Sequence, residues 1–357
     1  MELTTVWFGL IAVLWVGYFC LEGFDFGVGM LMPVLAHDDV ERRVLINTVG
    51  PVWDGNEVWV LVAGGATFAA FPEWYATLFS GFYLPLLLIL LALIVRNLAF
   101  EYRGKHEDAS WRRRWDLALV VGSYVPALLW GVAFANIVRG VPIDAAKEYT
   151  GNLFTLLNPF GLLGGLTTVL LFATHGAVFV ALKTDGDIRY RARVLALRLG
   201  LAAAVVAVAF LVWAQVLAGD LGSAVLFVGA ALALVGGLLA IRAGREGWAF
   251  LATMTTIAAA VVGLFVALFP DVMPSTTRAA FSLTTTNASA TDYTLTVMTW
   301  VAVVFTPIVL VYQGWTYWVF RRRISTRNIP GPTVGTPPVA GGPPPTLPER
   351  DETAAPA

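Results

Sequence analysis

The chain has 357 residues, of which 58% are hydrophobic and only 13% are charged. This composition excludes an ordinary soluble domain and is typical of a membrane protein with several spans. The formal net charge of −1 and the short, scattered basic clusters give no basis for nucleic-acid binding.

Nine apolar segments are long enough to cross a bilayer, which takes about 20 mostly apolar residues. They cover residues 6–35, 49–70, 74–100, 115–138, 155–182, 193–218, 221–241, 247–269 and 293–320. The connections between them are too short to hold a soluble domain. The sequence therefore predicts an all-α polytopic membrane protein with nine transmembrane helices. The first apolar segment is too long for a signal peptide and is expected to be retained.

Basic residues are concentrated in alternate connections, and only Arg139, Lys147 and Arg278 fall in the other set. Because cytoplasmic loops are enriched in Lys and Arg, this asymmetry predicts an N-terminus outside and a C-terminus in the cytoplasm. Residues 329–357 are rich in Pro, Gly and Thr, which predicts a disordered cytoplasmic tail.

Four acidic side chains interrupt the first two predicted spans: Glu22, Asp25, Asp54 and Glu57. A carboxylate near the bilayer centre costs about 2.5–3.5 kcal/mol on insertion scales, so four in one hairpin require a reason. Within each pair the two residues are three apart and share a helix face. The rise of about 1.5 Å per residue places the four at increasing depth from the cytoplasmic side. This series predicts a proton pathway, with Trp53 and Asn56 as supporting residues.

A structural role for the same carboxylates stays open. They can pair with Arg96, Asn56 or Asn97 and thereby hold the helices together. Next to them, Gly23 and Gly27 are four residues apart, a spacing that predicts close approach of a neighbouring helix.

Candidate metal and nucleophile positions are few. Cys20 is the only cysteine, which excludes an intrachain disulfide, a thiolate zinc site and an iron–sulfur cluster. Of three histidines only His175 lies inside an apolar segment, and a hydrogen bond across helices is favoured for it over a proton relay or a metal ligand. One buried histidine cannot hold several haems by histidine pairs. We therefore predict no metal site and no catalytic residue in this chain.

Several longer motifs carry a specific resemblance. They are Glu22-Gly-Phe-Asp-Phe-Gly-Val-Gly-Met30, Pro51-Val-Trp-Asp-Gly-Asn-Glu-Val-Trp59, Gly64-Gly-Ala-Thr-Phe-Ala-Ala-Phe-Pro72, Leu157-Asn-Pro-Phe-Gly-Leu-Leu163 and Phe269-Pro-Asp-Val-Met-Pro-Ser275. In order and spacing the chain resembles subunit II of the cytochrome bd quinol oxidases over about residues 5–320.

The resemblance implies two four-helix bundles, at residues 1–138 and 155–269, and a peripheral ninth helix at 293–320. It implies an obligate partner, subunit I, which carries haem b558, haem b595 and haem d together with the quinol site, whereas this chain binds no haem. The complex would oxidise a quinol, reduce dioxygen to water and take protons from the cytoplasm, in a bacterial cytoplasmic membrane.

The resemblance also assigns site residues. Asp54, which follows Trp53, and the first-helix acids Glu22 and Asp25 match the proton path of the family. Glu57 has the weakest match, because some relatives have a neutral residue there.

Small accessory subunits, a bound structural quinone or lipid, and the type of quinol are left open. The high content of Ala, Val and Gly favours menaquinol. Two other functions are considered. A proton-coupled secondary transporter also uses buried carboxyls, but it is expected to show inverted repeats with broken helices, which this sequence does not show. A scaffold without any proton role is the third.

Overall fold

The computed structural model describes residues 2–329, so the predicted tail at 329–357 lies outside the described residues apart from Ile329. Within this range the chain is almost entirely helical. The α-helices are α1 (Leu3–Leu35), α2 (Asp39–Val49), α3 (Trp53–Ala70), α4 (Pro72–Gly81), α5 (Tyr83–Tyr102), α6 (Ala109–Arg139), α7 (Leu153–Leu156), α8 (Pro159–Lys183), α9 (Asp187–Ala218), α10 (Leu221–Arg242), α11 (Glu246–Leu268) and α12 (Asp292–Val319). Two short antiparallel strands, β1 (Asp271–Met273) and β2 (Leu283–Thr284), lie between α11 and α12.

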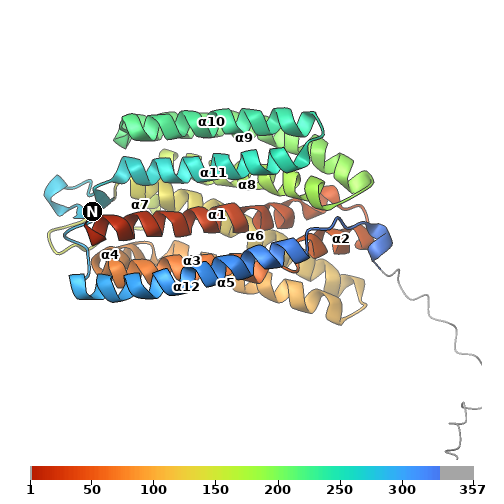
Figure 1. Cartoon of the computed structure of the whole chain (residues 1–357), viewed down its shortest axis with the longest axis horizontal. Helices are drawn as coiled ribbons and strands as arrows, with labels where there is room; N and C mark the ends of the chain where they lie inside the picture. The colour runs from red at the N-terminus through yellow and green to blue at the C-terminus, as the bar shows by residue number, and fades with distance from the viewer. Residues whose placement is uncertain (1, 330–357) are drawn as a thin grey trace, which may run out of the picture.

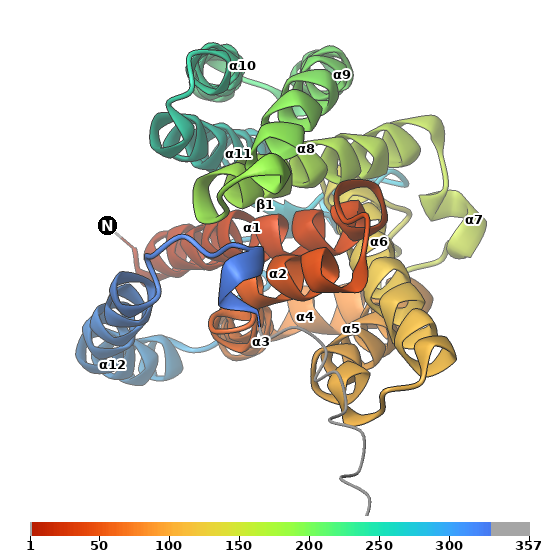
Figure 2. The same ribbon diagram turned by 90° about the vertical axis from the view of Figure 1, so that its right-hand side faces the viewer.

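The long helices lie side by side along the long axis of the molecule (Figure 1). Seen from the end, α1 occupies the centre, with α8 to α11 on one side and α3, α5 and α6 on the other (Figure 2). The last helix, α12, packs along the outside of α1 and α3. The first helix of the chain is therefore the axis around which the other helices assemble.

Eight helices in the described part of the chain are long and apolar enough to span a bilayer: α1, α5 with the turn after it, α6, α8, α9, α10, α11 and α12. This finding confirms a multi-span helical membrane protein. The remaining predicted span, 49–70, corresponds to α3, which is 18 residues long. This helix is not apolar enough to be counted with the other eight, because Asp54, Asn56 and Glu57 lower the hydropathy of its first turns.

One local prediction is wrong, and one helix was not predicted. The segment at 74–100 is not one helix but two, α4 and α5, which meet at Phe82. Pro85 has no N–H for the carbonyl four residues earlier, and it lies in the first turn of α5, where this loss is tolerated. The connection after the first span contains α2, a helix that hydropathy alone does not reveal. Its N-cap Asp38 accepts a hydrogen bond from the Glu41 N–H at 2.8 Å.

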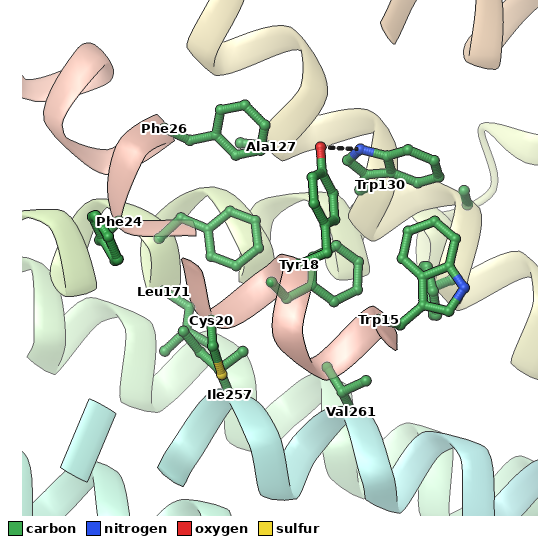
Figure 3. Close-up of a cluster of buried hydrophobic side chains, with 14 of the residues drawn as sticks. Trp15, Tyr18, Cys20, Phe24, Phe26, Ala127, Trp130, Leu171, Ile257 and Val261 are labelled. Atoms are coloured by element: carbon green, nitrogen blue, oxygen red, sulfur yellow. Dashed lines mark hydrogen bonds between the residues drawn. The ribbon is translucent and has the colours of Figure 1, made fainter. Parts of the chain in front are cut away.

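The core around α1 is built from aromatic contacts and glycine contacts. Trp15, Tyr18 and Trp130 pack edge to face, and the Trp130 indole N–H donates to the Tyr18 hydroxyl at 3.1 Å (Figure 3). Gly27 of α1 faces Gly176 of α8 so closely that a Cβ on Gly27 would lie 2.7 Å from the Gly176 Cα. The predicted close helix approach at Gly27 is thus confirmed, and it brings α1 against α8.

Candidate functional site

A cluster of ionisable side chains lies between α1, α3 and α5. Glu22 and Asp25 come from one face of α1, Glu57 from the second turn of α3, and Arg96 from the second half of α5. The side chains of Glu22 and Arg96 have no exposed surface, Asp25 is equally buried, and the Glu57 side chain is 16% exposed. We call these four residues the carboxylate cluster.

Arg96 is the cation that binds this cluster together. Its Nη1 donates to Glu22 Oε1 in a short ion pair and lies 3.5 Å from Glu57 Oε2. The guanidinium also lies over the rings of Phe26 and Phe100, at 4.9 and 5.3 Å from their centroids. Aromatic faces stabilise a desolvated cation, so the arginine is held in place by both charge and packing.

Two amide side chains and α12 complete the surroundings. Asn56 Nδ2 donates to Asp25 Oδ2 at 2.7 Å, and Asn97 Nδ2 donates to Glu57 Oε1 at 2.9 Å. On its other side, Asn56 Oδ1 accepts from the Tyr317 hydroxyl at 2.7 Å and from Gln313 Nε2 at 3.3 Å. The cluster is therefore enclosed by helices that are distant in the sequence.

The charges in the cluster do not balance. Three carboxyl groups, those of Glu22, Asp25 and Glu57, interact with one another and with the single guanidinium of Arg96. One oxygen of each carboxyl is buried without a hydrogen-bond partner in residues 2–329, namely Glu22 Oε2, Asp25 Oδ1 and Glu57 Oε2. In a low-dielectric interior, uncompensated carboxylates are strongly disfavoured, so such a group is suited to binding and releasing protons.

The structure separates two of the predicted residues, Asp54 and Trp53, from the others. Asp54 is exposed at the start of α3, where its Oδ1 accepts from the Gly55 N–H at 2.8 Å. Trp53 stacks on Phe100, with ring centroids 5.1 Å apart. Glu22, Asp25, Glu57 and Asn56 come together as a site, whereas Asp54 and Trp53 lie at its edge.

Two site residues were missed in the sequence. Gln313 and Tyr317 are four residues apart in an otherwise apolar helix, a spacing that puts both on one face. Polar side chains within a membrane span usually face protein, and this was the available signal. The sequence predicts Arg96 and Asn97 only as structural partners; the structure places Arg96 in the cluster and Asn97 beside it, as a donor to Glu57.

His175 lies apart from this cluster, between α8, α11 and α1. Its Nδ1 is 2.7 Å from Thr253 Oγ1 and its Nε2 is 3.1 Å from the Cys20 carbonyl oxygen. This confirms the hydrogen bond across helices. Both ring nitrogens are in use, so His175 does not fit as an axial haem ligand in this arrangement. Within residues 2–329 no three His, Cys, Asp or Glu side chains are grouped to hold a metal ion.

A second charged network lies at the end of the molecule that carries α2. Arg103 binds both Asp116 and Asp39, and Arg112 Nη1 lies 3.1 Å from Asp39 Oδ2. Partial burial on its own would raise the pKa of Asp39. The hydrogen bond from Arg103 and the charges of Arg103 and Arg112 outweigh burial and hold that pKa below its usual value. This network ties α2 to the adjoining ends of α5 and α6.

The fold and the site define a class: a helical membrane protein that crosses the bilayer several times and keeps ionisable side chains inside its helix assembly. The chain belongs to the cytochrome bd terminal oxidase subunit II family, whose sequence profile matches residues 3–320. The resemblance seen in the motifs is thereby confirmed, and the chain is a subunit of a bd-type terminal oxidase.

Two relatives match nearly the whole chain. Cytochrome bd ubiquinol oxidase subunit 2 of Bacillus subtilis (strain 168) is 44% identical over 335 residues, which is 92% of this chain and 98% of that protein. Cytochrome bd-I ubiquinol oxidase subunit 2 of Escherichia coli (strain K12) is 40% identical over 365 residues, which is 91% of this chain and 96% of that protein.

Among solved structures, a chain of the bd oxidase from Geobacillus thermodenitrificans has the same fold. Its TM-score is 0.75, with 90% of this chain and 99% of that chain covered. Sequence identity is 17%, so this match concerns the fold.

Proposed function

We propose that this chain is the haem-free subunit of a quinol oxidase of the bd type. It supports the haem-bearing subunit I and conducts cytoplasmic protons toward the site of oxygen reduction. In the complex, the haems of subunit I supply the electron-transfer and oxygen chemistry. Two observations support this division of work: family membership, and the engagement of both His175 ring nitrogens by Thr253 and Cys20. Menaquinol stays a prediction for the quinol.

We propose nine spans in the membrane, with α3 as the additional one. A helix of 18 residues is about 27 Å long at 1.5 Å per residue, close to the thickness of the hydrocarbon core. α3 packs along α1, and α4 continues the chain beyond it. Residues 1–138 and 155–269 form the two bundles, α12 is peripheral, the N-terminus is outside and the C-terminus is cytoplasmic. The arginine-rich network around α2 supports this orientation.

The observation that carries the proton role is the charge imbalance of the carboxylate cluster. Three carboxyls, two buried and one partly buried, face one guanidinium, and three carboxyl oxygens have no hydrogen-bond partner within residues 2–329. Full ionisation would bury two uncompensated negative charges, which is far more costly than binding protons. The cluster therefore holds protons and exchanges them.

The proposed route enters at Asp54. This carboxyl is exposed in the first turn of α3, at the positive end of the helix dipole. Glu57 follows one turn later and is the least buried member of the cluster. From Glu57 Oε2 the proton passes to the unpaired oxygens of Glu22 and Asp25. Arg96 keeps Glu22 charged when protons are absent and so lowers the cost of emptying the cluster.

The test is Asp25→Asn in the purified complex. Removing a positioned proton-transfer group costs about 100-fold or more, so quinol-driven oxygen uptake should fall by that order while the haem spectrum is retained. Asp54→Asn should give a smaller loss of oxygen uptake, because solvent also reaches Glu57, the next carboxyl on the proposed route. The control is Asp220→Asn, at the exposed N-cap of α10, where Asn is as good a cap as Asp.

Wild-type oxygen uptake in Asp25→Asn would remove the cluster from the proton path. A complex that no longer assembles would support the structural interpretation of the carboxylates instead.

A further inference from the structure

The outermost helix contributes polar side chains to the buried site. Most of α12 is exposed, and Leu295 is its only fully buried residue. Gln313 and Tyr317 are partly buried and both reach Asn56, which in turn donates to Asp25. Because α12 buries so few side chains, two hydrogen bonds from it to the same Asn56 amide indicate that α12 acts on the orientation of this amide.

The hydrogen bonds between α3, α12 and α1 run in one direction. Trp59 Nε1 donates to Gln313 Oε1 at 2.8 Å, and an indole N–H can only donate. Gln313 must therefore turn its carbonyl to Trp59 and its Nε2 to Asn56 Oδ1. This orients Asn56 with Nδ2 toward Asp25 Oδ2, at 2.7 Å. The donor-only indole thus decides which atom of Asn56 faces the carboxyl.

Tyr317 supports the same orientation. Its hydroxyl donates to Asn56 Oδ1 at 2.7 Å, so the carbonyl of Asn56 accepts two hydrogen bonds from α12. Rotating the Asn56 amide by half a turn would place its carbonyl against the carboxyl oxygen of Asp25 and its NH₂ against the donor of Gln313. Both contacts would be repulsive with Asp25 ionised.

We propose that Trp59, Gln313 and Tyr317 are positioning residues that fix Asn56 as a hydrogen-bond donor to Asp25. Asp25 Oδ2 is then committed as an acceptor, and Oδ1 is the oxygen that binds the relayed proton. Carboxamides and indole do not exchange protons readily, so the chain through α12 ends the path and keeps the proton beside Glu22 and Glu57. This inference rests on the proposed proton role of Asp25.

The decisive variant is Gln313→Glu. The carboxylate that it introduces, when ionised, accepts from both Trp59 and Asn56, so the Asn56 amide turns over and offers its carbonyl to Asp25. That arrangement favours protonated Asp25, which is also surrounded by Glu22, Glu57, Arg96 and Tyr317. The alkaline limb of the pH profile of oxygen uptake should move up by about one pH unit, the equivalent of a tenfold change in proton affinity.

Milder variants test the same chain. Tyr317→Phe and Trp59→Phe each remove one donor and should lower kcat by about three- to tenfold, with an unchanged KM for quinol. The carboxyl stretching band of Asp25, identified by its loss in Asp25→Asn, should shift in infrared difference spectra of each variant. Thr316→Val is the control, because within residues 2–329 its hydroxyl bonds only the Tyr312 carbonyl of its own helix.

The outcomes separate the two proposals. Full activity in Asp25→Asn overturns the proton role itself. An inactive Asp25→Asn complex combined with unchanged pH profiles and carboxyl bands in the α12 variants overturns the positioning inference alone. Suppose that the Gln313, Tyr317 and Trp59 variants lose activity while the pH profile and the carboxyl band of Asp25 stay unchanged. These residues then act only in stability, and the positioning inference is overturned as well. If Gln313→Glu does not assemble, Tyr317→Phe and Trp59→Phe decide by the same readouts.

Discussion

Arg96 of α5 and Glu22 of α1 form an ion pair in which neither side chain has any exposed surface. Such a pair adds little net stability over a well-packed apolar pair, because desolvation of the two charges offsets their attraction. Removing one partner is a different matter, since it leaves an uncompensated charge inside the helix assembly. The pair therefore makes α1 and α5 depend on each other.

Arg96→Leu should destabilise the protein by about 3–5 kcal/mol, the usual cost of breaking a buried ion pair. The measurement is thermal unfolding of the purified complex, with the yield of assembled complex as a second readout. The double variant Glu22→Leu/Arg96→Leu should recover much of the loss. Arg139→Leu, at the exposed end of α6, is the matched control. A single Arg96 variant as stable as wild type would contradict the pairing.

Gly27→Ala should disrupt the contact between α1 and α8. A Cβ at this position would lie 2.1 Å from the Phe172 carbonyl oxygen, and backbone atoms cannot move aside cheaply. Overpacking of this kind costs about 1–3 kcal/mol. Gly229→Ala in α10 has nothing within 4 Å of the added Cβ and should match wild type or exceed it slightly. Equal melting temperatures for the two variants would show that the approach is looser than the structure indicates.

Asp39→Asn tests the charged network beside α2. The pKa of Asp39 is lowered in the folded protein, so its ion pairs contribute stability above the ordinary pKa of aspartate, about 4. This contribution is lost as the pH falls through the lowered folded pKa. The melting temperature of wild type should thus exceed that of Asp39→Asn at neutral pH, and the gap should close below about pH 4.

Glu101→Gln, exposed at the end of α5, serves as its control and should show no such gap. A difference between Asp39→Asn and wild type that is the same at every pH would contradict the electrostatic origin.

His175→Leu separates a structural histidine from a proton relay. The ring links α8 to Thr253 of α11 and to the Cys20 carbonyl of α1, and it stacks on Phe250. Losing these buried hydrogen bonds should cost about 1–3 kcal/mol in thermal stability. The pH profile of oxygen uptake should stay as in wild type. A changed profile with unchanged stability would instead assign His175 to proton transfer. Thr255→Val, exposed on α11, is the control.

Much of the fold could be predicted from hydropathy, because long apolar runs bounded by charged turns leave few alternatives. The division of residues 74–100 into α4 and α5 could not be predicted from hydropathy, since the apolar composition continues through the break at Phe82. Pro85 is a local cue, but Pro126 and Pro307 lie inside the continuous helices α6 and α12, so a proline alone does not locate the break. The helix α2 was missed because it is amphipathic and short, so its N-cap at Asp38 was the only local cue.

The site was predictable in part for a similar reason. Glu22 and Asp25 stand out because an acid within an apolar run is costly. Their pairing with Arg96 and Asn56 depends on which helices neighbour α1, and local sequence does not encode that arrangement. For Asp54, three residues of helix are enough to move a side chain from the buried cluster to the exposed edge.

The contact between Gln313 and Asn56 joins residues 257 positions apart. A ribosome adds roughly 5–20 residues per second, so α12 is made roughly 10–50 s after the start of α3. Throughout that interval α1 and α3 carry their acids while Asn56 can still turn either way. The orientation of the proposed proton site thus depends on α12, which is made late in synthesis, and a chain terminated before α12 would carry the acids without their alignment.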